Sequence, residues 1–183
     1  FASVDDTCRD ISVTCIAPTK TFNLAGLQTA AVYAENSILH HRMWRQLNTD
    51  EVAEPNAFAI QATIAAFQYG EEWLDELREY VEKNKQYVTE FLQEKIPLIH
   101  PVAGDATYLM WLDCRKITES GRQFVKFIRK TSGLYVSGGN QYGRGGEGFL
   151  RVNVATSKLV VEDGMQRLYE SVDAWLKEEK ISK

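Results

Sequence analysis

The chain has 183 residues, 44% hydrophobic and 25% charged, so it can bury a core in one domain or two small ones and does not resemble a disordered or fibrous protein. A formal net charge of −4 gives no electrostatic reason to expect nucleic acid or an anionic membrane as a partner. No apolar run is long enough to span a bilayer, and the three cysteines are scattered without metal-ligand spacing. We therefore expect a cytoplasmic protein with reduced thiols and no membrane, nucleic-acid or metal partner.

Two short strands are predicted near the start of the chain. Residues 11–16 alternate apolar with small polar residues, and residues 29–33 are small and apolar. Apolar residues then recur at helical spacing over 37–47. A run rich in Ala and Ile after Pro55 predicts another helix, which Gly70 ends.

The clearest predicted helix covers residues 71–96. Its apolar residues recur at steps of three and four, and Pro97 stops it. A helix this long can bridge two substructures. We therefore place a domain boundary along it, between residues 1–75 and residues 76–183.

The remainder of the chain predicts strands and helices that follow one another around a glycine-rich loop. The expected elements are a strand at 108–112, a helix at 119–131, the loop at 137–148, a strand at 149–155 and a final helix at 159–176. Ser132 and Gly133 suit the end of the first of these helices, and Ser157 suits the cap of the last.

Lys20 lies between two threonines, close to the end of the first predicted strand. Most lysines at such a position extend into solvent, and taken alone this interpretation would be favoured. Among apolar neighbours, however, an ammonium loses hydration, its pKa falls, and the amine can form a Schiff base with an aldehyde. The hydroxyls of Thr19 and Thr21 can hold a phosphate nearby. This combination suggests pyridoxal phosphate as a cofactor.

The segment APTKTFNLAGLQTA, residues 17–30, resembles the cofactor-lysine segment of fold type I pyridoxal-phosphate enzymes, the class I/II aminotransferase superfamily. It is most similar to the subgroup of cystathionine β-lyases, or C-S lyases. Three later stretches resemble that subgroup in order and spacing: NAFAIQATIAAFQYGEEWLDELREYV, ATYLMWLDCR and YGRGGEGFLRVNVAT. The resemblance implies an α/β fold, with residues 1–75 as the C-terminal remnant of the large three-layer cofactor domain and residues 76–183 as the small α+β domain.

The resemblance also implies the chemistry. Lys20 would carry the cofactor and then act as the general base on the substrate Cα proton. A lyase would release pyruvate, ammonia and a thiol from cystathionine or a related cysteine thioether. The alternative is an aminotransferase, which would release a keto acid. The same lysine serves both routes, so its motif does not choose between them.

Arg151 and Tyr142 are the candidate substrate-binding residues. Strand alternation puts Phe149, Arg151 and Asn153 on one face, where the arginine could simply face solvent. The resemblance implies instead that Arg151 grips the substrate α-carboxylate, which a planar guanidinium matches with two hydrogen bonds. The glycine-rich loop could be a plain hairpin connection, but the resemblance makes it a mobile wall of the substrate site, with Tyr142 as a contact.

Two positions depart from the aminotransferase pattern. Aminotransferases of this superfamily often have a serine three residues before the lysine and an arginine eight after it, both on the cofactor phosphate. This chain has Ala17 and Gln28 there. Because Gln28 is neutral, the pattern favours the lyase-like subgroup. Thr19 remains as the local phosphate ligand, with Thr21 the weaker candidate.

The family residues that surround the cofactor ring lie upstream of the lysine, and only nineteen residues precede Lys20. The chain also begins at Phe1 without a methionine. We therefore expect the C-terminal part of a longer enzyme, which alone would hold the cofactor poorly and be nearly inactive. The resemblance further implies a homodimer with an amino-acid substrate. A rival of another class is a non-enzymatic regulator that keeps the fold, and intact Lys20 and Arg151 argue against a purely degenerate binding module.

Overall fold

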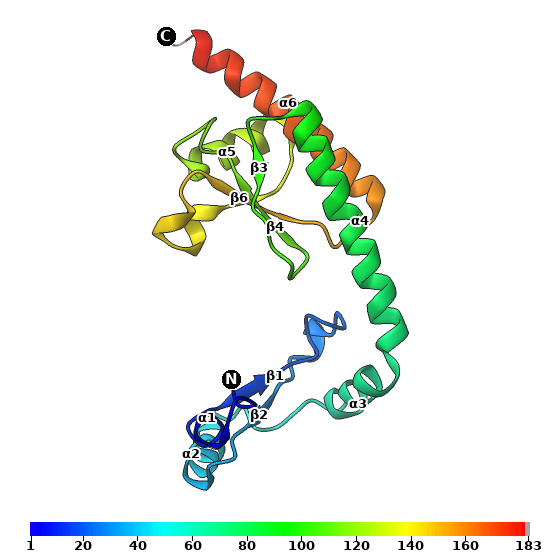
Figure 1. Ribbon diagram of the computed structural model, residues 1–183, viewed down its shortest axis with the longest axis vertical. Helices are drawn as coiled ribbons and strands as arrows, with labels where there is room; N and C mark the ends of the chain where they lie inside the picture. Colours follow the sequence, from blue (N-terminus) through cyan, green and yellow to red (C-terminus); the bar gives the residue numbers. More distant parts are fainter. Residues whose placement is uncertain (182–183) are drawn as a thin grey trace. The chain divides into compact units, whose positions relative to one another are not determined.

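The computed structural model describes residues 1–181 and divides into two compact units, Phe1–Leu77 and Arg78–Lys183, each of which is described by itself (Figure 1). The division falls within α4 (Glu71–Lys95). Among the described helices, none combines the length and apolar character that a membrane crossing requires.

The first unit combines short helices with one two-stranded sheet. Its elements are α1 (Asp6–Asp10), β1 (Thr14–Ile16), a 3-10 turn (Ala25–Leu27), β2 (Ala31–Tyr33), α2 (Ser37–Thr49), α3 (Ala59–Tyr69) and the start of α4. The strands β1 and β2 pair antiparallel, with Cys15 opposite Val32. Asn36 begins α2 because its side chain accepts hydrogen bonds from the backbone N–H groups of Ile38 and Leu39.

The first strand is shorter than predicted. It begins at Thr14 and not at Ile11, because a helix that the sequence pattern did not indicate, α1, precedes it. The side chain of Asp5 caps this helix by accepting a 2.7 Å hydrogen bond from the N–H of Cys8, and Ile11 is the residue at its C-terminal end.

The helices predicted from apolar periodicity in this half of the chain are confirmed. They correspond to α2, α3 and α4. Gly70 ends α3, as predicted, and α4 ends at Lys95, two residues before Pro97, which cannot continue a helix.

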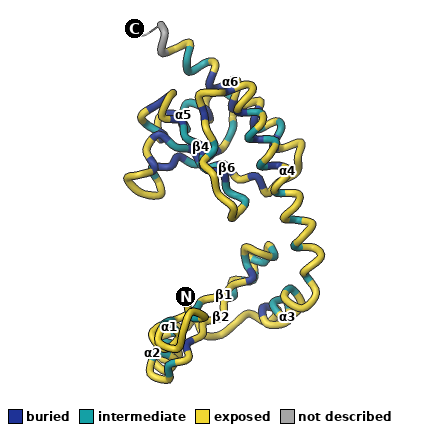
Figure 2. Tube along the Cα trace, in the orientation of Figure 1, coloured by how far each residue is buried: buried dark blue, intermediate teal, exposed yellow. Residues whose placement is uncertain are grey.

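The first unit buries little of its own surface (Figure 2). Its buried residues are Pro18, Ala34 and Ala59. Many large apolar side chains are exposed on its helices, among them Trp44 and Ile60. Apolar surface on this scale is typical of a face that other protein covers.

The second unit is an antiparallel sheet covered by helices. The sheet has the order β3-β4-β6-β5, and the elements are β3 (His100–Pro101), β4 (Leu109–Asp113), α5 (Gly121–Ser132), β5 (Ser137–Gly138), two 3-10 turns (Gly139–Tyr142 and Arg144–Gly146), β6 (Phe149–Asn153) and α6 (Lys158–Ile181), together with the rest of α4. Gly133, with φ 74°, ends α5 as the sequence predicts, whereas the helix begins two residues later than the predicted Glu119, after Ser120 as its cap.

The core of the second unit lies between one face of the sheet and its helices (Figure 1). Leu112 of β4 and Leu150 of β6 are fully buried there, together with Leu92 of α4, Phe124 of α5 and Leu168 of α6. Because side chains alternate along a strand, the intervening residues of β4 and β6 point to the opposite face. That opposite face carries the second group of candidate site residues.

Candidate active site

Lys20 lies in the turn that follows β1. Two backbone hydrogen bonds close this turn, from Phe22 N to Pro18 O at 2.9 Å and from Leu24 N to Thr19 O at 3.0 Å. Lys20 itself is exposed, so its predicted burial among apolar neighbours is wrong for this chain. The reason is that the β1–β2 pair has only two strands, and the described part of the first unit lays no further layer over the turn.

The two threonines flank Lys20 in this turn. Thr19 is half-buried and Thr21 is exposed. A lysine with a hydroxyl-bearing residue on each side in the sequence suits a ligand that carries both an aldehyde and a phosphate, because the amine can bond the aldehyde and a hydroxyl can donate to a phosphate oxygen. Gln28, at the end of the 3-10 turn, has a left-handed backbone with φ 47°, and its side chain is neutral.

Phe22 anchors the turn to the helices of the first unit. Its ring meets the Phe67 ring edge-on at 5.3 Å between centroids and stacks at 6.3 Å with Trp73. Gly70 permits this packing, because a Cβ at that position would lie 2.8 Å from Cε1 of Phe22 and 2.4 Å from Ala66 O. The position of the Lys20 turn therefore depends on a glycine fifty residues further along the chain.

Replacing Gly70 by alanine is expected to destabilise the first unit by about 1–3 kcal/mol, because the new methyl group overpacks the Phe22 site. The measurement is urea denaturation of the Gly70→Ala variant. Gly26→Ala is the matched control, since a Cβ at Gly26 meets no atom within 4 Å. Equal unfolding midpoints for the two variants would contradict this account of the turn.

Arg151 lies on the open face of the second unit's sheet. It is opposite Trp111 of β4 and Ser137 of β5, while its neighbours Leu150 and Val152 are buried on the other face. The predicted alternation is therefore confirmed. Among the described residues of this unit, no carboxylate forms an ion pair with Arg151. Its guanidinium is thus available to an anion from outside the unit.

Aromatic rings continue from Arg151 across the same face and form a stacked row of five side chains. The guanidinium of Arg151 lies 4.4 Å from the centroid of Tyr142, whose ring meets Trp111 edge-on at 5.7 Å. Trp111 stacks on Phe149 with 5.6 Å between the ring centroids, and the guanidinium of Arg115 lies 4.9 Å from the centroid of Phe149. We call Arg151, Tyr142, Trp111, Phe149 and Arg115 the stacked row.

Asp113 fixes one end of the stacked row. Its carboxylate accepts hydrogen bonds from Nε and Nη2 of Arg115, at 2.9 and 2.7 Å. The hydrogen bonds from Arg115 hold the pKa of Asp113 below its usual value. This two-point contact fixes the plane of the guanidinium that covers Phe149.

The glycine-rich loop is folded closely onto the row. A Cβ at Gly139 would lie 2.9 Å from the Trp111 ring, and a Cβ at Gly146 would lie 2.0 Å from the carbonyl oxygen of Gly139. Gly143 has φ 116°, a conformation that glycine adopts without strain. The glycines therefore allow the backbone of this loop to approach the row closely. Oδ1 of Asn140 is buried there without a hydrogen-bond partner.

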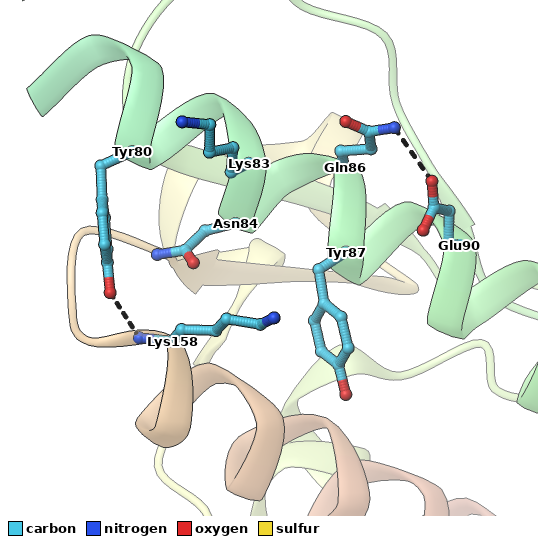
Figure 3. A pocket seen from close by; sticks show the side chains of 7 residues that line it. All are labelled: Tyr80, Lys83, Asn84, Gln86, Tyr87, Glu90 and Lys158. Carbon is cyan, nitrogen blue, oxygen red and sulfur yellow. Dashed lines mark hydrogen bonds between the residues drawn. The ribbon is translucent and has the colours of Figure 1, made fainter. Parts of the chain in front are cut away.

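A separate hollow of about 380 Å³ lies in the second unit, between α4 and the start of α6 (Figure 3). On its floor Asn84 is 2% exposed and donates to the carbonyl oxygens of Val154 and Thr156, at 2.9 and 3.0 Å. The hydroxyl of Tyr80 accepts a 2.8 Å hydrogen bond from the N–H of Lys158 (Figure 3). These contacts fix the chain just after the strand that carries Arg151.

Replacing Asn84 by alanine is expected to destabilise the second unit by about 2–4 kcal/mol, because two carbonyl groups lose their donor in a buried site. Thermal and urea unfolding measure this loss. Gln86→Ala, at an exposed position of the same helix, is the control and is expected to change stability by less than about 0.5 kcal/mol. An Asn84→Ala variant as stable as the control would contradict the anchoring role.

Cys114 is expected to resist alkylation at pH 8, whereas the exposed Cys15 reacts. Burial, and then the nearby charge of Asp113, raise the pKa of Cys114 from 9.0 to about 12. Because the pKa is raised on folding, the neutral thiol stabilises the fold fully below pH 9, and this contribution is lost as the pH rises toward 12. Mass spectrometry after a timed iodoacetamide pulse checks the order of reaction, and equal labelling of the two thiols would contradict it.

The predicted site residues fall in both units. Lys20, Thr19 and Thr21 lie together in one turn of the first unit, and Arg151 and Tyr142 lie in contact in the second. The other members of the stacked row were not predicted from the sequence. Alternation along the two strands places Trp111 on one face, but the register that sets it opposite Arg151 is visible only in the structure.

Comparison with known proteins identifies the family. The family model described as aminotransferase class I and II matches residues 5–168. The chain is 39% identical over 168 residues to cystathionine beta-lyase PatB of Bacillus subtilis (strain 168), a match that covers 92% of this chain and 43% of that protein. It is 30% identical over 156 residues to protein MalY of Escherichia coli (strain K12), covering 85% and 40%.

Solved structures share the fold. Cystalysin from Treponema denticola, which contains a pyridoxal 5′-phosphate cofactor, superposes with a TM-score of 0.90 at 25% identity, covering 94% of this chain and 44% of that one. The PLP-bound C-S lyase from Staphylococcus hominis gives 0.77 at 30% identity, covering 89% and 42%. The chain thus spans less than half the length of these relatives, and the predicted fold class is confirmed as part of a fold type I enzyme. The chain belongs to the class I and II aminotransferase family.

Proposed function

We propose that this chain forms the C-terminal part of a pyridoxal-phosphate-dependent C-S β-lyase that cleaves cystathionine or a related cysteine thioether. The observation that carries the proposal is Lys20, flanked in sequence by Thr19 and Thr21 in a closed turn, in a chain that is 39% identical to a cystathionine beta-lyase. The neutral Gln28 supports a lyase over an aspartate-type aminotransferase.

The residues present fit pyridoxal phosphate. Lys20 would bond its aldehyde, and the hydroxyl of Thr19, with Thr21 as the weaker candidate, would donate to its phosphate. When bound, the cofactor supplies an electron sink for the charge that develops on the substrate Cα. The exposure of Lys20 in this chain indicates that further protein must cover the site before it excludes water.

The chain's own residues would then bind the substrate and move its proton. Arg151 would hold the α-carboxylate through two parallel N–H donors, which orients the substrate. Lys20 would take the Cα proton as general base. The Cβ–S bond then breaks, the thiolate leaves and is protonated, and water completes the balance by releasing pyruvate and ammonia. One thioether and one water thus give one thiol, one pyruvate and one ammonium.

Product analysis tests the proposal. The enzyme that contains this chain is incubated with L-cystathionine and pyridoxal phosphate in the absence of any keto acid. We expect pyruvate, ammonia and a thiol in equal amounts. A keto acid that forms only when an acceptor keto acid is added would overturn the lyase and identify an aminotransferase.

We also propose the domain and subunit organisation. Residues 1–75 would be the end of the large cofactor domain, residues 76–183 would be the small domain, and the enzyme would be a cytoplasmic homodimer. The division after Leu77 and the large apolar side chains exposed on the first unit support this organisation. Sedimentation of the enzyme at the mass of two chains is the expected result.

A further inference from the structure

The stacked row constrains the side chain that we assign to the substrate carboxylate. Arginine has several rotatable bonds, and ordering its side chain costs rotamer entropy. The central guanidinium carbon of Arg151 lies over the Tyr142 ring, 4.4 Å from its centroid. Stacking on the face leaves the N–H donors at the edge free, and the edge is what a carboxylate binds. The contact therefore orders the arginine without occupying its donors.

Tyr142 is itself held in place by the rest of the row. Trp111 meets the Tyr142 ring edge-on at 5.7 Å, an arrangement that aromatic pairs prefer. Trp111 in turn lies between the glycine-rich loop and Phe149, and the Asp113–Arg115 pair fixes the far end. Tyr142 is 48% exposed, and its position is nevertheless defined by its contact with Trp111.

We propose that Tyr142 and Trp111 are positioning residues that hold Arg151 ready for the α-carboxylate of the substrate. The proposal rests on the proposed function, because that function assigns the carboxylate to Arg151. It goes beyond a substrate contact at Tyr142, since both aromatic residues act through the arginine. It also gives Trp111 a role that its place on a strand does not suggest.

The test is an NMR titration of the enzyme that contains this chain, labelled with ¹⁵N-arginine. The probe is S-methyl-L-cysteine, a thioether amino acid, and its carboxamide is the probe without the charge. We expect the guanidinium signals of Arg151 to shift with the acid and not with the carboxamide. Arg151→Ala identifies these signals by their loss.

The variants separate positioning from general structure. Tyr142→Phe keeps the ring and is expected to bind the acid like the unmodified chain. Tyr142→Leu removes the cation–π contact, and we expect about 3- to 30-fold weaker binding. Trp111→Leu is expected to weaken binding in the same direction. Tyr135→Leu is the matched control, because Tyr135 lies 5.0 Å from the guanidinium of Arg129 in the same unit. It is expected to leave the Arg151 titration unchanged.

The outcomes distinguish the two proposals. If Arg151 responds to the acid and Tyr142→Leu binds as tightly as Tyr142→Phe, the positioning role is overturned while the carboxylate assignment stands. If Arg151 in the unmodified chain shows no response that depends on the carboxylate, the carboxylate assignment falls and the positioning role falls with it. If binding of the acid weakens in Tyr142→Leu and Trp111→Leu but not in the other tyrosine variants, the positioning role and the carboxylate assignment are both supported.

Discussion

Replacing Lys20 by alanine is expected to abolish pyridoxal-phosphate-dependent release of pyruvate, with a loss of at least about 10²- to 10⁴-fold in kcat from the missing general base alone. The variant also loses the amine that bonds the cofactor aldehyde, so the residual rate is expected to fall further. A coupled assay for pyruvate on the enzyme that contains this chain measures the loss.

Two controls make this result specific to the amine. Lys20→Arg keeps the positive charge but forms no Schiff base under these conditions, so it is expected to be as inactive as Lys20→Ala. Lys126→Ala, an exposed lysine of α5, is expected to retain full activity. Activity in Lys20→Arg close to that of the unmodified enzyme would show that only charge matters at this position and would contradict the assignment.

Replacing Arg151 by alanine is expected to raise KM for an α-amino-acid substrate by about 10- to 150-fold, since hydrogen bonds to a charged group contribute about 1.5–3 kcal/mol. The KM of Arg151→Lys is expected to lie between those of the unmodified enzyme and Arg151→Ala, because an ammonium keeps the charge but not the two parallel donors. Steady-state kinetics with L-cystathionine gives the comparison.

Arg129→Ala is the control for Arg151. Arg129 also stacks on a tyrosine of the second unit, Tyr135, at 5.0 Å. It lies on α5 and not on the open face of the sheet, so its removal is expected to leave KM unchanged. A KM that rises equally in Arg129→Ala and Arg151→Ala would indicate a general effect on the unit and no carboxylate contact.

The longer elements follow from the sequence because their determinants are local. The helix predicted at 71–96 is α4, at Glu71–Lys95, since its apolar periodicity and the following proline act within the helix itself. The final helix at 159–176 is confirmed at its start, Lys158, where the carbonyl oxygen of Ser157 accepts from Val160 and Val161.

Short elements are missed because they depend on partners distant in sequence. β3 and β5 have two residues each and exist only through pairing with β4 and β6. A two-residue strand has no periodicity to detect. α1 is five residues long and rests on one capping bond from Asp5, a signal too weak to outweigh the strand pattern that follows it.

The candidate site residues likewise depend partly on local sequence and partly on contacts between distant segments. Lys20 and Arg151 were indicated by a resemblance in motif, and the structure adds what motifs do not contain. The dependence of the Lys20 turn on Phe22 and Gly70, and of Arg151 on Trp111, is a matter of packing between segments far apart in the chain. The sequence left both exposure and burial of Lys20 open, because burial is set by the layers around a turn and not by the turn's own residues.

Borohydride reduction of the protein with pyridoxal phosphate tests whether Lys20 is the cofactor lysine. The account predicts a pyridoxyl group on Lys20 alone. After trypsin it would appear in the peptide of residues 10–42, because the modified lysine is not cleaved. Equal labelling of the other lysines, with no preference for this peptide, would contradict the claim.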